Sequence, residues 1–441
     1  ATGPDGKEDA RLVPGSNTLE TPVAGKPGPI QAIWIGQGAP MARGAGKNLP
    51  LVLDLHARGG GIPSKGNRPN FLFFGDASMG WRAGLPFEFT ATIRDGAVSI
   101  VPNDRAWTGG RRQSEAQDER NDCPAVNTWW FGYNERFYQS ALEPKTLLNN
   151  YTERWVLGLV HWAQAYFETD SPATHVWGGS MGGSGAVALC LRHPQEFASA
   201  WAEVPMVRFV AAPVRTLNRL EAIGGPIDDR TLTADDRKLT DWVDGVWQAK
   251  RHTGDLPYLF ILHGRQDPVI PWVMNPPFYK AMLEARQGLS AFWNNYAHND
   301  MSRHLPADVD SWLTLMRKYR LDASFPVFSQ NTDNRDFGKG DPADGDIVGW
   351  LNRGMDWRDV LDTPKQYAIT LIPNHPEISF PITVTVTFRR LQEFKVSPRQ
   401  EATVTIGDRK PATITADAQG LITVRDVKIT DCAGVRIVMR K

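Results

Sequence analysis

One short segment, Gly178-Gly179-Ser180-Met181-Gly182, limits the folds open to this chain because a serine lies there between glycines. Residues 174–177 predict a short strand before it, and the small side chains of 184–192 predict a helix after it. A sharp turn from strand to helix strains the backbone, and glycines on both sides avoid clashes. The helix N-terminus would also favour negative charge beside the serine. We therefore predict that Ser180 is a nucleophile; a Gly/Ser-rich loop that matches by chance is the alternative.

Apolar runs alternate with helical patterns over most of the chain. The run Leu49–Leu55 has the near-continuous apolar character of a strand buried on both faces. Similar strands are predicted at 97–102, 198–204, 256–263 and 290–295, and helices at 152–168 and 308–317. This alternation predicts an α/β fold, a doubly wound and mostly parallel sheet over residues 30–321. Residues 207–255 lack a strand of this type and are predicted to form a helical insertion or cap.

The two ends of the chain differ from this central part. Residues 1–29 are rich in Gly, Pro and charge, and we expect an irregular N-terminal arm. Residues 322–364 are rich in Asp, Gly and Asn and are predicted to be a linker. From 365 to 441, short strands alternate with turns such as Gly407-Asp408. This pattern predicts a small antiparallel β-sandwich, for which we expect a mainly structural role, with attachment to the substrate as the weaker alternative.

Composition excludes several classes of protein. Lys+Arg and Asp+Glu are equal at 49 each, so the charge gives no support to a nucleic-acid partner. No stretch of eighteen or more apolar residues is present, so no membrane span is predicted. The three cysteines, Cys123, Cys190 and Cys432, form no CxxC pair, and we expect neither a metal nor a cofactor. The first residue is Ala1, which fits a processed secretory protein as well as a chain trimmed for other reasons.

A serine hydroxyl needs a base that accepts its proton and an acid that orients the base. With a nucleophile at a strand-to-helix turn, the usual chain order is serine, acid, histidine. Asp267 follows the strand that ends at His263, and it is the predicted acid; a turn-forming Asp before Pro268 is the alternative. His298 follows the next strand and is the predicted base, with His304 as its competitor. Residues beyond strand carboxyl ends meet at the ligand crevice of such sheets.

This arrangement also needs two backbone N–H groups to stabilise a negative oxygen in the transition state. One is predicted at Met181, directly after the nucleophile. The other is predicted in the glycine-rich loop after the strand Leu49–Leu55, at Arg58, with Ala57 or Gly59 as alternatives. The glycines could also serve only to form a tight loop.

These motifs resemble those of the α/β-hydrolase superfamily, and more narrowly of its secreted esterases related to polyhydroxybutyrate depolymerases and feruloyl or acetyl-xylan esterases. The resemblance rests on Leu55-His56, on 178–182, on His263-Gly264-Arg265-Gln266-Asp267 and on His298, and it covers residues 30–320. It implies an α/β-hydrolase fold and a serine hydrolase that cleaves carboxylic esters through an acyl-enzyme. Small or polymeric plant-derived aryl and acetyl esters are the implied substrates, and a secreted or periplasmic location is expected. The chain departs from many members at Ala57-Arg58, where they have a glycine after the histidine.

Aromatic residues are frequent in segments that should lie above the sheet. Flat apolar rings suit sugar faces, aryl esters or hydrophobic polymers. The predicted substrate-binding residues are Trp81, Trp129, Trp130 and Trp272. A role in the core is the alternative for each of them.

Two further interpretations remain open. A serine peptidase of the prolyl-oligopeptidase type shares the same order of catalytic residues, and a binding protein could use the same fold without activity. The acidic stretch 341–346 could suggest calcium, but it lacks the D-x-D-x-D-G spacing of an EF-hand loop, and a solvated linker is favoured there.

Overall fold

The computed structural model describes residues 8–11, 33–36, 41–58, 89–104, 106–107, 125–134, 147–213, 224, 231–233 and 236–441. The chain divides into two compact units. Unit 1 comprises residues 1–189 and 208–244, and unit 2 comprises residues 190–207 and 245–441.

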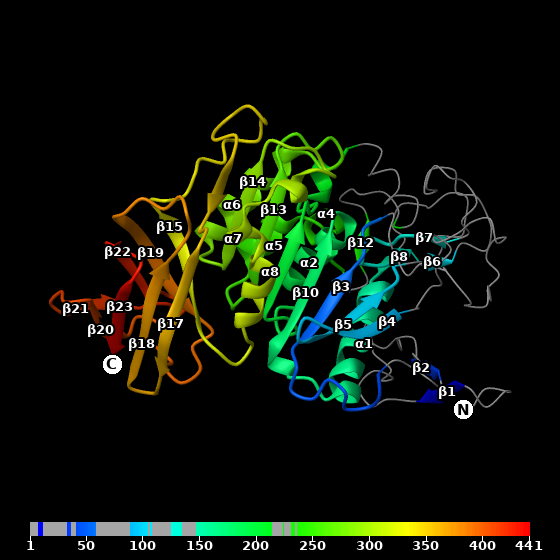
Figure 1. Cartoon of the computed structure of the whole chain (residues 1–441), viewed down its shortest axis with the longest axis horizontal. Coiled ribbons are helices and arrows are strands. Elements are labelled where there is room, and N and C mark those ends of the chain that lie inside the picture. Colours follow the sequence, from blue (N-terminus) through cyan, green and yellow to red (C-terminus); the bar gives the residue numbers. More distant parts are fainter. Residues whose placement is uncertain are drawn as a thin grey trace. The chain divides into compact units, whose positions relative to one another are not determined.

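Unit 1 contains four neighbouring strands of an α/β sheet (Figure 1). Strand β3 (Leu51–Leu55) pairs in parallel with β10 (Thr174–Gly179) on one side and with β5 (Ala97–Pro102) on the other. Strand β4 (Phe89–Arg94) adds an antiparallel edge next to β5. Leu51, Leu53 and Leu55 are almost fully buried, as expected for a parallel strand covered on both faces.

Two helices flank these strands in the sequence. Helix α1 (Tyr151–Phe167) buries Trp155, Leu159 and Trp162, and the next residue, Glu168, has a φ of 58° that ends the helical path. The short helix η2 (Ser171–Ala173) then leads into β10. Helix α2 (Met181–Arg192) starts two residues after β10 ends, so no loop separates the strand from the helix except Ser180.

Smaller elements of unit 1 lie outside this sheet. They are β1 (Glu8–Arg11), β2 (Ile33–Gly36), β6 (Ala106–Trp107), β7 (Ala125–Val126), β8 (Tyr133–Asn134), β9 (Leu147–Asn149), η3 (Phe209–Ala211), β12 (Leu232–Thr233) and α4 (Leu239–Trp242). Strand β1 pairs with β2, so the expected irregular arm contains at least one strand. Phe131, Leu148, Leu239 and Trp242 form a small apolar cluster, which packs part of the predicted insertion against the segment before α1.

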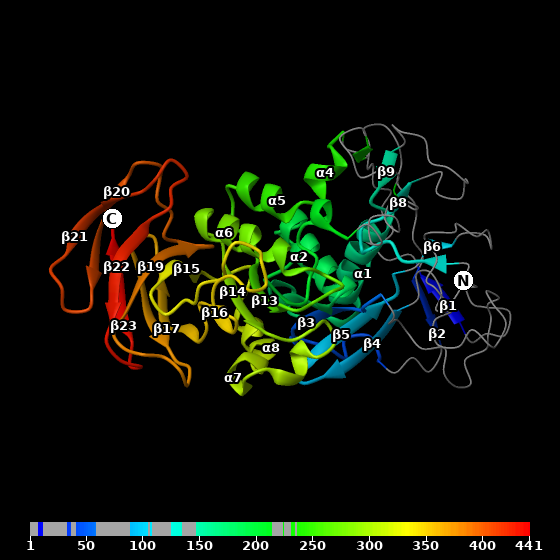
Figure 2. The same ribbon diagram turned by 90° about the horizontal axis from the view of Figure 1, so that it is seen from above.

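Unit 2 continues the α/β pattern. Strands β11 (Ser199–Glu203), β13 (Tyr258–Gly264) and β14 (Leu289–Asn294) are parallel neighbours, and β16 (Gly349–Leu351) pairs antiparallel with β14. Figure 2 shows α5 (Gly245–Arg251) and α6 (Asn275–Glu284) on one side of these strands, and α7 (Ala307–Asp310) and α8 (Trp312–Leu315) on the other. Short turns of helix complete this part: η4 (Trp272–Met274), η5 (Met301–His304) and η6 (Met316–Lys318).

The C-terminal part of unit 2 is antiparallel. One sheet has the order β15-β19-β22 and the other β17-β18-β23-β20-β21. Their strands are β15 (Phe325–Asn331), β17 (Met355–Asp362), β18 (Gln366–Pro373), β19 (Ile382–Arg389), β20 (Glu401–Ile406), β21 (Ala412–Thr415), β22 (Thr423–Ile429) and β23 (Val435–Arg440). Together with the helix-flanked parallel strands, these sheets confirm the predicted fold class, an α/β-hydrolase fold followed by a β-sandwich.

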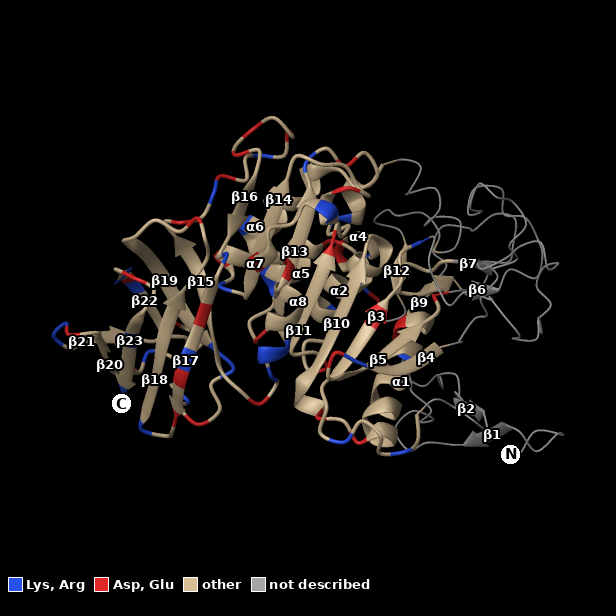
Figure 3. Ribbon diagram, viewed as in Figure 1, with Lys and Arg blue, Asp and Glu red and all other residues tan. Residues whose placement is uncertain are grey.

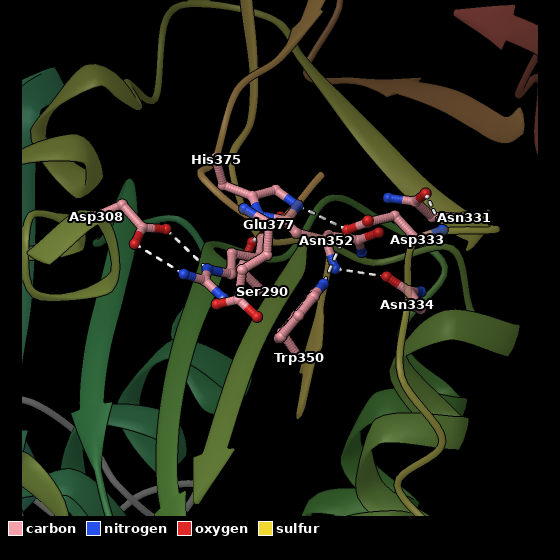
Figure 4. Close-up of polar contacts among 10 residues, drawn as sticks. Ser290, Asp308, Asn331, Asp333, Asn334, Trp350, Asn352, His375 and Glu377 are labelled. Carbon is pink, nitrogen blue, oxygen red and sulfur yellow. Dashed lines mark hydrogen bonds and ion pairs between the residues drawn. The ribbon is translucent and has the colours of Figure 1, made fainter. Parts of the chain in front are cut away.

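The prediction of a linker over residues 322–364 is wrong, because this segment contains the strands β15, β16 and β17. Polar contacts bind it to its surroundings (Figure 4). Arg353, only 1% exposed, donates from Nε and Nη2 to the carboxylate of Asp308 at 2.8 and 2.9 Å and from Nη1 to Glu377 at 2.8 Å. The side chain of Asn352 donates to the carbonyls of Leu289 and Phe328, at 2.9 Å each. Within this segment, Asn352 and Arg353 are therefore buried and paired, whereas the acidic stretch 341–346 is mainly exposed.

Lys and Arg as well as Asp and Glu are scattered over the described elements (Figure 3). Among the helices of the described residues, none combines the length and the apolar character that a membrane crossing requires.

Candidate active site

Ser180 occupies a strained position between β10 and α2. Its φ is 55°, in the left-handed region that a residue with a side chain rarely adopts. Its carbonyl accepts hydrogen bonds from the backbone N–H and the hydroxyl of Ser184, both at 2.9 Å, which continue the helix from the turn. This backbone is the sharp strand-to-helix turn that the sequence predicted.

The glycines around Ser180 are required by close backbone contacts. A Cβ on Gly178 would lie 2.4 Å from the carbonyl carbon of Gly182. A Cβ on Gly182 would lie 1.8 Å from the carbonyl oxygen of Leu55 and 3.0 Å from that of His56. Since real side chains do not tolerate such distances, glycine allows the start of α2 to press against the end of β3.

This contact brings the two predicted oxyanion donors to the same end of the sheet. Met181 is the first residue of α2, where backbone N–H groups have no partner within the helix. Leu55 at the end of β3 pairs with Gly178, and Arg58 follows three residues later. The carbonyl of Arg58 accepts a hydrogen bond from the side-chain amide of Asn127 at 3.1 Å. The loop at Arg58 is therefore anchored by the segment 125–134.

A buried carboxylate that sequence reasoning missed supports this loop. Asp104 is fully buried, and its backbone N–H donates to Nε2 of His56 at 2.9 Å, while Nδ1 of His56 lies 2.8 Å from the carbonyl of Ala57. The Asp104 carboxylate accepts the N–H and hydroxyl of Thr128 and the N–H of Trp130. Asp104 follows the end of β5, and that position after a strand was the available signal.

The same carboxylate binds the backbone of Trp130, one of two predicted substrate residues in this segment. Trp129 and Trp130 have φ values of 57° and 61°, so the chain turns sharply there. Trp130 is fully buried, with its ring 4.9 Å from that of His56 and against Gly185 of α2, whose added Cβ would lie 2.5 Å from it. Trp130 is therefore a core residue and not an exposed wall. Trp129 is 8% exposed and packs edge-on against Phe209.

In unit 2, the predicted acid and base are in direct contact. Nδ1 of His298 lies 2.6 Å from Oδ2 of Asp267, and the Asp267 side chain is completely buried. The other carboxylate oxygen, Oδ1, accepts the backbone N–H groups of Val269 and Ile270 at 2.7 and 2.9 Å. With Oδ1 already occupied by two donors, Oδ2 is directed at the imidazole. A proton on Nδ1 that donates to Asp267 leaves Nε2 as the basic nitrogen of the ring.

Backbone contacts hold the two loops together. The N–H of Arg265 donates to the carbonyl of Asn294 at 2.8 Å, and that of Gln266 to the carbonyl of Tyr296 at 3.2 Å. The side chain of Asn294 donates to the carbonyl of Met301 at 3.2 Å, which closes the segment containing His298. Backbone hydrogen bonds between the two segments thus continue past the ends of β13 and β14, into the loops that carry Asp267 and His298.

Two ionisable groups lie near this pair. His263 is fully buried, and burial lowers its pKa to about 4, although the Asp267 carboxylate and the Ile270 carbonyl act in the opposite direction. Burial raises the pKa of Glu203 at the end of β11, while a hydrogen bond with Ser302 and the charge of His298 lower it. At neutral pH, His263 is therefore uncharged and is not a competing base.

The competing base and the remaining predicted aromatics have other places. His304 stacks on Tyr296, with ring centroids 3.9 Å apart. Trp272 is 1% exposed, between His263, Tyr279 and Trp293, with the guanidinium of Arg265 5.0 Å from its ring centroid. Its burial contradicts the exposure expected of a substrate-binding ring. Trp81 lies outside the described residues.

The acidic stretch 341–346 is neither a linker nor arranged around an open cation site. Its carbonyls surround the side chain of Arg265, which donates to those of Asp341, Pro342, Asp344 and Asp346. Within the described part of the chain, no cluster of three or more His, Cys, Asp or Glu side chains is arranged to hold a metal ion.

Comparisons with known proteins agree with this chemistry. Residues 114–252, which include Ser180 and Met181, match the Esterase family. A search of curated proteins gives no match.

Solved structures resemble the chain at low identity. An S-formylglutathione hydrolase from Agrobacterium tumefaciens is 18% identical, with 66% of this chain and 89% of that chain covered and a TM-score of 0.40. A ferulic acid esterase is 14% identical, with 62% and 83% covered and a TM-score of 0.34. An acylaminoacyl peptidase from Pyrococcus horikoshii is 10% identical, with 62% of this chain but only 38% of that chain covered and a TM-score of 0.39.

The sheet, the elbow at Ser180 and the family match lead to one conclusion. The described strands and helices form an α/β-hydrolase fold, and the match of residues 114–252 to the Esterase family supports a carboxylic ester hydrolase.

Proposed function

We propose that the chain is a serine esterase in which Ser180 is the nucleophile, His298 the base and Asp267 the acid. The observation that carries this proposal is the left-handed backbone of Ser180 between β10 and α2, with φ 55°. Such strain persists where the surrounding structure imposes it, and this turn exposes a serine hydroxyl above the sheet in α/β-hydrolases. The 2.6 Å contact between His298 and Asp267 supports the assignment of the base and the acid.

In the proposed reaction, Ser180 Oγ forms a bond with the carbonyl carbon of the ester while His298 takes the hydroxyl proton. The amides of Met181 and Arg58 would stabilise the negative oxygen. When the carbonyl reforms, the bond to the alcohol breaks, and the alcohol leaves with the proton from His298. Water, deprotonated by His298, then attacks the acyl-serine, and this releases the carboxylic acid and restores Ser180.

Asp267 would act by stabilising the imidazolium and fixing the ring. Its carboxylate is held by the N–H groups of Val269 and Ile270 before any substrate binds, so no reorganisation is needed during proton transfer. Removing a triad member typically lowers turnover by about 10³-fold or more.

For the substrate, we propose aryl or acetyl esters of polymeric or plant origin, cleaved outside the cytoplasm. Support comes from the aromatic segment 125–134, which contacts the oxyanion loop where Asn127 donates to the carbonyl of Arg58. In this segment Tyr133 is half-buried, whereas Trp129, Trp130 and Phe131 are buried.

A fluorophosphonate probe tests the nucleophile. We expect covalent labelling on Ser180 in the full chain, and we expect Ser180→Ala to abolish both labelling and the hydrolysis of chromogenic esters. His298→Ala should lower kcat by about 10³-fold or more. His304→Ala is the matched control, because His304 follows the same strand but stacks on Tyr296, and it should change kcat by less than about 3-fold.

A panel of chromogenic esters of increasing acyl length, run beside a panel of peptides, tests the reaction class. Faster turnover of the peptides would favour the peptidase interpretation. Undiminished hydrolysis by Ser180→Ala would refute the proposed nucleophile.

A further inference from the structure

Residues 336–346 form a closed loop between β15 and β16, which we call the clasp loop. Its carboxylates bind its own backbone: Asp346 Oδ2 accepts the N–H of Asp336 at 2.8 Å, and Asp344 Oδ2 accepts that of Lys339 at 2.9 Å. Asp341 Oδ1 accepts the N–H of Ala343 at 2.8 Å. Asp side chains commonly close turns in this way. Several carbonyls of the loop also accept hydrogen bonds from another partner, although that of Asp346 is shared with the Nε1–H of Trp293.

That partner is the guanidinium of Arg265. Nε donates to the carbonyl of Pro342 at 2.9 Å, and Nη1 to that of Asp346 at 2.6 Å. Nη2 donates to the carbonyls of Asp341, at 3.0 Å, and Asp344. These contacts use four of the five donors that an arginine side chain has.

The remaining surroundings of Arg265 also restrict its movement. The side chain is 1% exposed, and its guanidinium lies over the ring of Trp272 at 5.0 Å. The acidic residues of the clasp loop, which connects β15 to β16 in the sequence, supply negative charge around it. A buried arginine held by a fork of backbone carbonyls is fixed in direction as well as in position.

Arg265 belongs to the turn that carries Asp267, so a loop that holds the Arg265 side chain also holds this turn. Arg265 lies two residues before Asp267, and its own backbone N–H is bonded to the carbonyl of Asn294. The N–H of Asp267 donates to the carbonyl of Gly264 at 3.2 Å, so residues 264–267 form one tight turn. An arginine fixed from the side-chain end and from the backbone therefore fixes the turn from which the Asp267 carboxylate projects.

We propose that Arg265 is a positioning residue for the catalytic acid and that the clasp loop is the part of the chain that holds it. This proposal rests on the proposed function, in which Asp267 orients His298. Arg265 does not bind substrate carboxylates, because it is buried and four of its five donors are bonded to the clasp loop. Its effect on the reaction passes through the 2.6 Å contact between Asp267 and His298.

The test compares Arg265→Lys with Arg390→Lys in the full chain. Arg390 is a matched control, since it is also buried and donates to backbone carbonyls, those of Phe197, Ala198 and Arg320, at the opposite, amino end of β11. Lysine keeps the charge but cannot span several carbonyls. Arg265→Lys should lower kcat by about 10-fold or more with KM changed less than about 3-fold, because small misplacements of catalytic groups are costly.

The acid limb of the kcat/KM profile should also move to lower pH in Arg265→Lys. A displaced Asp267 stabilises the protonated imidazole less, so protonation requires more acid. Arg390→Lys should lower Tm but leave kcat and the pH profile of the folded enzyme unchanged. An Arg265→Lys enzyme that loses only Tm, as the control does, would overturn the proposal.

A second variant and a second readout separate this proposal from the esterase assignment. Gly345→Ala perturbs the clasp loop alone, because Gly345 has a φ of 79° and its Cβ would lie 2.6 Å from the carbonyl of Asp336. The low-field ¹H NMR signal of the His298 Nδ1 proton reports its bond to Asp267 without any substrate. We expect this signal to shift or broaden in Arg265→Lys and in Gly345→Ala. An unchanged signal in both variants refutes the positioning role, whereas a normal signal with no fluorophosphonate labelling of the unmodified chain refutes only the esterase assignment.

Discussion

At the scale of single residues, three aspartates at or near strand ends differ in the hydrogen-bond donors that surround their carboxyl groups. Asp267 has three donors around its carboxylate, and Asp104 has its own set from Thr128 and Trp130. Asp54 is half-buried in β3, and burial raises its pKa to about 7 against the smaller, opposite effect of Arg94. Ionising Asp54 therefore costs stability.

This difference predicts a dependence of stability on pH. The pKa of Asp54 rises from 3.8 to about 7 on folding, so between these values the folded chain binds more protons than the unfolded chain. The contribution of Asp54 to stability is then greatest below its unfolded pKa and falls as pH rises through the folded value. Asp54→Asn keeps the neutral form at every pH, so the Tm difference in its favour should grow from about pH 5 to about pH 8, by about 2 °C or more. Parallel Tm curves for the two proteins would contradict this prediction.

Single residues also show how far sequence reasoning reaches. Ser180, Asp267 and His298 were predicted from local signals, namely glycines at a turn and polar residues after apolar runs, and the structure brings Asp267 and His298 into contact. The burial of Trp130 and Trp272 was not predictable in this way. It depends on Asp104 and Gly185 for Trp130, and on Arg265 for Trp272, which are tertiary neighbours.

At the scale of elements, the strand-to-helix turn at Ser180 depends on the close approach of α2 to β3. Gly182 on α2 faces the carbonyl oxygens of Leu55 and His56, which are backbone atoms and cannot rotate away. The two predicted oxyanion donors are close to this contact in the sequence: Met181 directly precedes Gly182, and Arg58 follows His56 by two residues. The distance between helix and strand therefore sets the geometry of the proposed oxyanion site.

Gly182→Ala tests this dependence. Its Cβ would lie 1.8 Å from the Leu55 oxygen, so α2 must move away from β3 at a cost of about 1–3 kcal/mol or more. We expect a lower Tm and slower fluorophosphonate labelling of Ser180. Gly254→Ala is the control, because a Cβ there meets nothing within 4 Å. Equal labelling rates for both variants would show that the elbow tolerates a wider separation.

Element boundaries were predicted less well than element types. The helix expected at 308–317 is divided into α7, α8 and η6. Residues 322–364 were misinterpreted because Asp and Gly are typical of solvated linkers. In the structure, the aspartates of the clasp loop cap its own amides, and the loop is completed by Arg265, more than seventy residues earlier in the sequence. Composition alone does not reveal a partner at that distance.

At the scale of the whole molecule, the C-terminal sheets belong to the same compact unit as Asp267 and His298. Arginines make the attachment. Arg390 donates to the carbonyls of Phe197, Ala198 and Arg320, at 2.9–3.2 Å, and Arg286 on the hydrolase side lies 2.5 Å from Asp417. The strand pattern predicted a sandwich, but these long-range contacts were not visible in the sequence.

Deletion of residues 365–441 should prevent the remaining chain from folding stably. The cut would remove β18, the neighbour of β17, and β19, the neighbour of β15, so two strands would become unpaired edges. It would also remove the Arg390 guanidinium, which donates to the carbonyls of Phe197 and Ala198. We expect the shortened chain to be insoluble or to show no cooperative thermal transition by circular dichroism, and to lose labelling of Ser180. Arg390→Lys in the full chain should instead stay folded with a lower Tm. A soluble shortened chain that hydrolyses a small ester at the rate of the full chain would show that the sandwich is a separable module.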